Sequence, residues 1–195
     1  MSAARSGGSR RGGAAAPVCL ALLRGINVGG RNKLPMDELR AVCAGLAWKS
    51  VGTYIQSGNL VFRSKDAPAT LEAELEEAIE GHFGLTIPVL VRTARAWEGL
   101  LRGNPFPEAG EAEPSRVVLA LSKRAPQKGA AEALSERAAD GERVVRVGAA
   151  LWIHHPKGVG RSKLTPALLD RLVGSPVTAR NWRTVQALAT LARQA

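Results

Sequence analysis

The order of the predicted elements constrains this chain more than any other feature, because nearly the same succession occurs twice. In the first half, apolar residues predict strands over 18–24 and 87–93. Between them, a turn at 57–59 joins two short β-rich runs as a hairpin. Apolar residues at helical spacing predict helices over 36–46 and 69–83. The first half therefore follows the order β-α-β-β-α-β.

The second half follows a similar order and ends in helices. Its predicted elements are strands over 116–122, 142–147 and 149–154 and helices over 127–139, 164–174 and 181–193. A β-α-β-β-α-β order folds into an antiparallel sheet with both helices on one face, the split βαβ or ferredoxin-like arrangement. We therefore predict an α+β fold with two similar ferredoxin-like halves and antiparallel sheets. One larger continuous sheet is the alternative that this order leaves open.

Local composition divides the chain into four parts. Residues 1–16 are rich in Gly, Ser and Ala, carry three arginines and lack the apolar stretch of a signal peptide, so we predict a disordered basic tail. An N-terminal α+β subdomain is expected over 17–104 and a C-terminal α+β subdomain over 116–195. The acidic, Pro-rich residues 105–115 between them are predicted to be a linker.

Overall composition limits the classes of protein to which the chain can belong. Its 195 residues are 45% hydrophobic, which is enough for a core, and its formal net charge is +10. No stretch approaches the roughly 18 apolar residues of a membrane helix. The two cysteines, Cys19 and Cys43, lack metal or redox spacing and predict a reduced, cytoplasmic protein. We expect no metal and no cofactor.

The first candidate ligand-binding segment is a loop between a predicted strand and a predicted helix, called here the first Gly/cation loop (residues 23–33). Its glycines allow backbone N–H groups to converge on an anion, and the helix N-terminus adds a favourable dipole. The glycine intervals do not fit G-x-G-x-x-G, and a tight connection that needs glycine is the alternative. The candidate residues are Arg24, Gly25, Asn27, Gly29, Gly30, Arg31 and Lys33.

Three further segments supply candidates. The second Gly/cation loop (residues 154–164) precedes a predicted helix but lacks the Gly-Lys-Ser/Thr run of a phosphate-binding loop. The hairpin turn at 54–59 sets polar side chains beside the sole tyrosine, and the helix start at 178–185 combines arginines with an expected N-cap. A solvent-exposed strand face and a capped helix are the respective alternatives. The candidates are Arg161, Ser162 and Lys163; Gln56, Ser57 and Asn59; and Arg180 and Asn181.

Six separated segments together resemble one bacterial family. They read ALLRGINVGGRNKLPMDELR, TYIQSGNLVF, IPVLVRTA, NPFP, HHPKGVGRSKL and ARNWRTV, in that order. From about Ala21 to about Leu188 the chain is similar to the family catalogued as domain of unknown function 1697 (DUF1697). The resemblance implies an α+β fold with two similar halves and no particular reaction. Members commonly carry other residues where Lys157 and Arg183 stand, and both departures add positive charge.

These patterns lead to three hypotheses of function. We expect a protein that binds an anionic partner, either a phosphorylated small molecule or a nucleic-acid backbone, through the Gly/cation loops and Arg180. An enzyme with its site between the two halves is the alternative, and a protein-interaction module is a third. No carboxylate pair or nucleophile motif stands out, so no catalytic residue is assigned.

Overall fold

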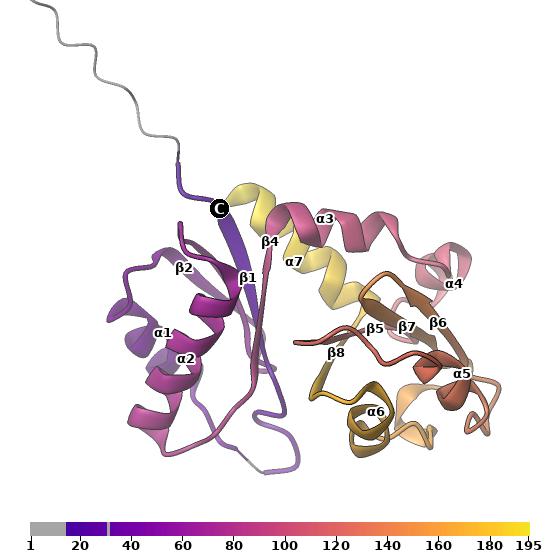
Figure 1. The fold of residues 1–195 in the computed structure, drawn as a ribbon. Helices are drawn as coiled ribbons and strands as arrows, with labels where there is room; N and C mark the ends of the chain where they lie inside the picture. The colour runs from indigo at the N-terminus through magenta and orange to yellow at the C-terminus, as the bar shows by residue number, and fades with distance from the viewer. Residues whose placement is uncertain (1–14, 31) are drawn as a thin grey trace, which may run out of the picture.

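The computed structural model describes residues 15–30 and 32–195. Residues 1–14 of the predicted tail, and the candidate Arg31, lie outside the described residues. The described chain forms two four-stranded antiparallel sheets, with strand orders β2-β3-β1-β4 and β6-β7-β5-β8 (Figure 1). The predicted fold class, α+β with two similar ferredoxin-like halves, is confirmed, and the alternative of one continuous sheet is wrong.

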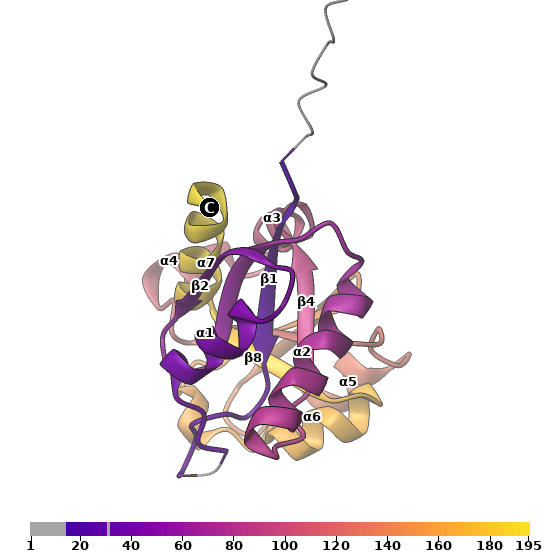
Figure 2. The ribbon, with the colours of Figure 1, turned by 90° about the vertical axis from the view of Figure 1, so that its left-hand side faces the viewer.

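The first half carries its helices on one face of its sheet (Figure 2). Its elements are β1 (Val18–Leu23), α1 (Met36–Ala44), β2 (Lys49–Tyr54), β3 (Asn59–Arg63), α2 (Pro68–Phe83) and β4 (Val89–Thr93). Alternate residues of β1 point to opposite faces, so Cys19, Ala21 and Leu23 pack against α1 and α2. Leu20 and Leu22 point the other way, toward the second half. This is why β1 is apolar along its whole length.

The second half repeats the arrangement around β5. Its elements are β5 (Val117–Ser122), α5 (Ala130–Ser135), β6 (Arg143–Val147), β7 (Ala150–His154), the 3₁₀ helix η1 (Val159–Arg161), α6 (Pro166–Val173) and β8 (Val177–Asn181). Val118 and Ala120 of β5 pack with α5 and α6 in one core. Leu119 and Leu121, on the other face, join the core shared with the first half.

Three helices complete the molecule: α3 (Ala94–Arg102), α4 (Pro107–Ala112) and α7 (Trp182–Gln194). Helix α7 runs between the two sheets and α3 lies along the top beside it (Figure 1). Trp97, Trp152 and Trp182 are buried in the core that these helices share with the sheets. Residues 105–115, expected as a linker, include α4, and Phe106 beside it is 4% exposed within the same core. Among the described residues, no helix is both long and apolar enough to cross a membrane.

Strand β8 corrects the prediction for the second half. The sequence led us to expect only a connection between two helices there, but residues 177–181 pair with β5 in antiparallel register. This strand completes the β-α-β-β-α-β order. Its Val-Thr-Ala-Arg-Asn sequence shows no clear apolar alternation, because its partner strand and not its own pattern stabilises it. The helix predicted over 127–139 is shorter in the structure, where only α5 (Ala130–Ser135) is helical.

Candidate functional site

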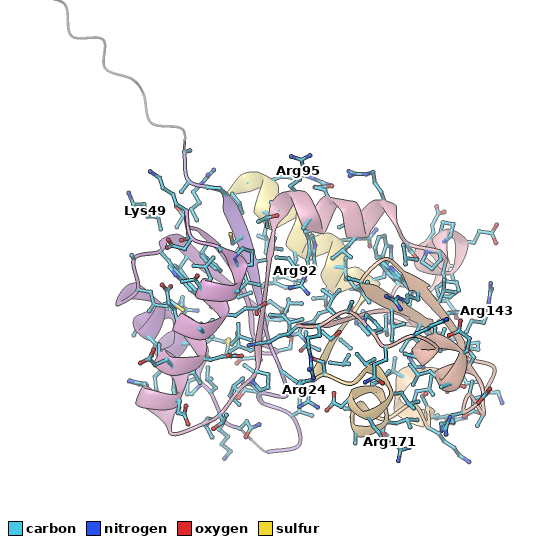
Figure 3. The ribbon with its side chains drawn as sticks, viewed as in Figure 1. Arg24, Lys49, Arg92, Arg95, Arg143 and Arg171 are labelled. Atoms are coloured by element: carbon cyan, nitrogen blue, oxygen red, sulfur yellow. The ribbon has the colours of Figure 1, made fainter. Side chains whose placement is uncertain are left out.

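A cleft of about 590 Å³ opens between the two halves. The first half contributes residues that follow β1 and residues of the hairpin turn between β2 and β3. The second half contributes the start of α6, the strand β8 and the start of α7. Figure 3 shows Arg24 lying between the two halves. The cleft thus combines three of the four segments that the sequence singled out, which lie far apart along the chain.

Arg180, on β8, is the central charged residue of this cleft. It donates through Nε to Asn59 Oδ1 (2.6 Å), through Nη1 to the carbonyl oxygen of Ala179 (2.9 Å), and through Nη2 to the carbonyl oxygens of Leu23 (2.8 Å), Ser57 (2.9 Å) and Gly58 (3.2 Å). Among the described residues, no carboxylate forms an ion pair with it. Burial lowers the pKa of the Arg180 guanidinium to about 10, so the group stays charged at neutral pH.

The hairpin turn is built to hold this guanidinium. Asn59 is fully buried, and its Nδ2 donates to the Tyr54 carbonyl and to Ser57 Oγ, both at 3.0 Å. Its remaining amide oxygen is therefore turned toward Arg180. Gly58 has a φ of +71°, and a Cβ at that position would lie 2.6 Å from Ile26 Cδ1. Only glycine fits there, and the close approach brings two turn carbonyls to Arg180.

Arg24 differs from Arg180 because its charge is balanced. Its Nη2 lies 2.5 Å from Asp170 Oδ2, and its Nε donates to the Val177 carbonyl at 3.0 Å. The other Asp170 oxygen accepts a hydrogen bond from the Val177 backbone N–H at 2.8 Å. These contacts tie the end of β1 to α6 and β8. Asp170 is a site residue that sequence reasoning missed, and the only signal for it is that aspartate is scarce in this chain.

Asn27 organises the first Gly/cation loop. Its φ is +54°, its Nδ2 donates to the carbonyls of Leu34 and Gln56, and its Oδ1 accepts from the Leu34 N–H, each at 2.9 Å. These contacts tie the loop to the hairpin turn. Gly25 lines the cleft. Gly29, Gly30, Lys33 and Gln56 are exposed and are not among the residues that line it.

The second Gly/cation loop is not brought to the cleft. Ser162 Oγ donates to Glu142 Oε1 at 2.5 Å and accepts from the Leu164 N–H at 3.1 Å. The hydroxyl therefore holds the second Gly/cation loop in place. Arg161 and Lys163 are exposed. Burial would raise the pKa of Glu142, but the hydrogen bonds from Ser162 and from backbone N–H groups outweigh it and lower that pKa. The structure therefore does not unite the 24–33 and 161–163 segments in one site.

Asn181 and Ser57 add polar side chains to the lining of the cleft, as do Thr178 and Thr184. The Asn181 side chain accepts a hydrogen bond from the Thr184 N–H at 2.9 Å, so the predicted N-cap is confirmed. Trp182 behind it is buried, as the helical spacing predicted. Within the described residues, no three His, Cys, Asp or Glu side chains are grouped so that they could hold a metal ion.

Sequence reasoning also missed the apolar part of the cleft. The apolar side chains that line it are Ile26, Val28, Ile55, Pro166, Leu169 and Val177. Val28 and Ile55 are 65% and 50% exposed, respectively. Each stands as an apolar residue within a polar turn or loop, and this is the one signal in the sequence that could have found them.

Comparison with known proteins agrees with the fold described above. The family described as "Protein of unknown function (DUF1697)" matches residues 17–152. A solved structure, that of the conserved bacterial protein SP0830 from Streptococcus pneumoniae, has a TM-score of 0.70 and 24% identity over 91% of this chain and 99% of that chain, and so shares the fold. A search of curated proteins finds no match. The family match covers most of the chain, which therefore belongs to the DUF1697 family.

Proposed function

We propose that this protein binds a small organic anion, bearing a phosphate or carboxylate group, in the cleft between its two halves. The observation that carries the proposal is the guanidinium of Arg180, which lies half-buried beside the cleft with only carbonyl and amide oxygens as partners. Of the described residues that line the cleft, two are arginines and none carries a carboxylate. Asp170, which is not among the lining residues, balances Arg24, so Arg180 is the lining cation left without a carboxylate partner among the described residues.

The energetics of a partly buried charge support an anion there. An ion withdrawn from water is unfavourable unless an opposite charge or many hydrogen bonds compensate it, and carbonyl dipoles supply only part of that compensation. Charge-assisted hydrogen bonds to a phosphate or carboxylate are stronger than bonds between neutral groups. A bound anion would therefore add to Arg180 what the protein oxygens lack.

The shape of the cleft favours a small molecule over a nucleic-acid backbone. Its volume of about 590 Å³ falls within the usual range for small-molecule sites. A polyanion would instead need cations spread over the surface. Lys33, Arg161 and Lys163 are exposed in this way, but they do not line the cleft.

Isothermal titration calorimetry with inorganic phosphate, adenosine monophosphate and a short DNA duplex tests the proposal. We expect the two small anions to compete for one site per chain at low salt. The duplex should bind more weakly than adenosine monophosphate. No binding of either small anion, or binding of the duplex alone, would refute the proposal.

A matched pair of variants at Ala179 distinguishes an effect on anion binding from an effect on folding. Ala179 is exposed and lines the cleft next to Arg180. Ala179→Glu places a carboxylate beside the site and should reduce anion affinity at least about tenfold, whereas Ala179→Gln adds nearly the same volume without charge. Both variants keep Arg180 and its partners. Equal affinities in the two variants would show that the anion binds elsewhere.

A further inference from the structure

We infer that the ligand is an amphiphile in which a single acid group is joined to an apolar body. This inference rests on the proposed function and specifies its ligand class. Arg180 provides a charged group in the cleft. The apolar lining comes from Ile26, Val28 and Ile55 in the first half, and from Pro166, Leu169 and Val177 in the second.

Exposed apolar surface gathers at this cleft. Four large hydrophobic side chains are exposed in the described part of the chain, and two of them, Val28 at 65% and Ile55 at 50%, line the cleft. Apolar surface left in water is unfavourable in proportion to its area. A ligand with an apolar body would cover this surface, and an inorganic ion would not.

The backbone of Ile55 gives an independent indication. Its φ is +49°, in the left-handed region that β-branched residues strongly disfavour. Ile55 is the first residue of the turn that follows β2, where Asn or Gly would be the relaxed choice. A strained position that nevertheless carries an exposed isoleucine, at the edge of a cleft, is typical of a side chain needed for contact with a ligand.

The volume of the cleft indicates the same class of ligand. The cleft holds about 590 Å³, which is far more than a phosphate or carboxylate group alone would fill. The charge of Arg180 and the exposed side chains of Val28 and Ile55 indicate how the bound molecule is oriented. The acid group lies at Arg180, and the apolar body extends toward Val28 and Ile55.

Titration with octyl phosphate, decanoate, octanol and inorganic phosphate, each below its micellar concentration, tests the inference. Octyl phosphate should bind at least about tenfold more tightly than inorganic phosphate, because its chain removes apolar surface from water. Octanol, which lacks the acid group, should bind more weakly than octyl phosphate. The comparison with decanoate distinguishes a phosphate from a carboxylate headgroup.

Three variants test the apolar lining. Val28→Ser and Ile55→Asn should each weaken octyl phosphate binding several-fold more than they weaken inorganic phosphate binding. Val159→Ser is the matched control, because Val159 is 49% exposed and does not line the cleft. Ile55→Asn should also leave the protein at least as stable as the wild type, since Asn tolerates a positive φ.

The outcomes separate this inference from the proposed function. If octyl phosphate binds no more tightly than inorganic phosphate, the inference of an amphiphilic ligand is wrong. The same holds if Val159→Ser weakens its binding as much as Val28→Ser and Ile55→Asn do. In both cases the proposed anion site is unaffected. Should no anion bind at all, both are wrong.

Discussion

At the scale of single residues, Arg180 joins the two halves as well as lining the cleft. Its guanidinium on β8 reaches the carbonyls at the end of β1 and in the hairpin turn, 157 and 123 positions away in the sequence. Planar donors in a fixed fork suit this task, because one side chain can satisfy several oxygens at once. We therefore expect loss of the side chain to lower stability in addition to its effect on the proposed binding.

Replacing Arg180 tests this role. Arg180→Met should lower the free energy of unfolding by about 3 kcal/mol, because buried oxygens lose their donors. Arg180→Lys keeps the charge and should recover only part of the loss. Urea denaturation measures both, with Arg183→Met as the control, since Arg183 is exposed and its side chain makes no hydrogen bond within the described residues. Losses of similar size at both positions would contradict the assignment.

A second single residue, His155, should make the stability of the fold depend on pH. It is 3% exposed, and its Nδ1 has no hydrogen-bond partner among the described residues. Burial lowers the pKa of His155; Glu142 raises it and His154 lowers it further, and the net shift is downward. As the pH falls below the ordinary histidine value of about 6.5, the unfolded chain takes up a proton before the folded protein does.

We therefore expect stability to fall as the pH is lowered from about 7 to about 5. The lowered pKa of Glu142 adds a loss of the same sign at lower pH. His155→Gln should flatten the upper part of this dependence in urea titrations at several pH values. His82→Gln, at a half-exposed histidine, is the control. An unchanged pH profile in His155→Gln would show that another group is responsible.

At the scale of elements, α2 protects the open edge of the first sheet. Glu72 Oε1 accepts a hydrogen bond from the Val91 N–H at 2.9 Å, and Glu76 Oε1 accepts one from the Val89 N–H at 2.7 Å. Both N–H groups lie on the free edge of β4, which would otherwise be a template for another strand. Lys123, just beyond β5, lies 2.6 Å from Glu76, so the same carboxylate also contacts the second half.

Removal of one carboxylate tests the protection of this edge. Glu72→Ala should lower the free energy of unfolding by about 2 kcal/mol, since it leaves a buried N–H unpaired, and should increase aggregation on heating. Glu72→Gln keeps an acceptor and should lose less. Glu77→Ala, at an exposed position on the same helix, should be nearly neutral. Thermal unfolding with light scattering measures both effects.

Helix periodicity alone does not reveal this role. It places Glu72 and Glu76 with the other glutamates on the outer side of α2, yet Glu72 is 8% exposed. The strand β8 escaped prediction for a similar reason. Both depend on a neighbouring strand edge, and a sequence pattern within one element contains no information about what lies beside it.

At the scale of the whole molecule, the two halves share one core. Leu20, Leu22 and Leu90 of the first sheet pack in the same cluster as Leu119 and Trp152 of the second. Polar contacts reinforce this packing, among them Arg24 with Asp170 and Arg92 with the Ser122 carbonyl at 2.9 Å. Separation of the halves would expose this apolar layer to water, at a cost proportional to its area.

We therefore expect the halves to unfold together. Far-UV circular dichroism and tryptophan fluorescence should give coincident urea transitions, because Trp48 reports on the first core while Trp97, Trp152 and Trp182 report on the shared one. Two resolved transitions would contradict the shared core. A small anion should shift the single midpoint upward if it binds the cleft, since that site needs both halves.

The sequence by itself determined what depends on neighbours along the chain. Apolar spacing defined the first-half elements, turn chemistry defined the hairpin, and the N-cap at Asn181 followed from residue type and position. The repeated element order was then sufficient for the fold class, because short connections leave few ways to arrange such elements.

Only the tertiary structure decided which of the candidate residues meet. It brought Arg24, Ser57 and Arg180 to one cleft, left the 161–163 segment outside it, and added the apolar side chains of Val28 and Ile55. It also showed that Asp170 balances Arg24, whereas no described carboxylate balances Arg180. These pairings join residues more than a hundred positions apart, and such distances are fixed by the packing of two sheets on a common core and not by any local pattern.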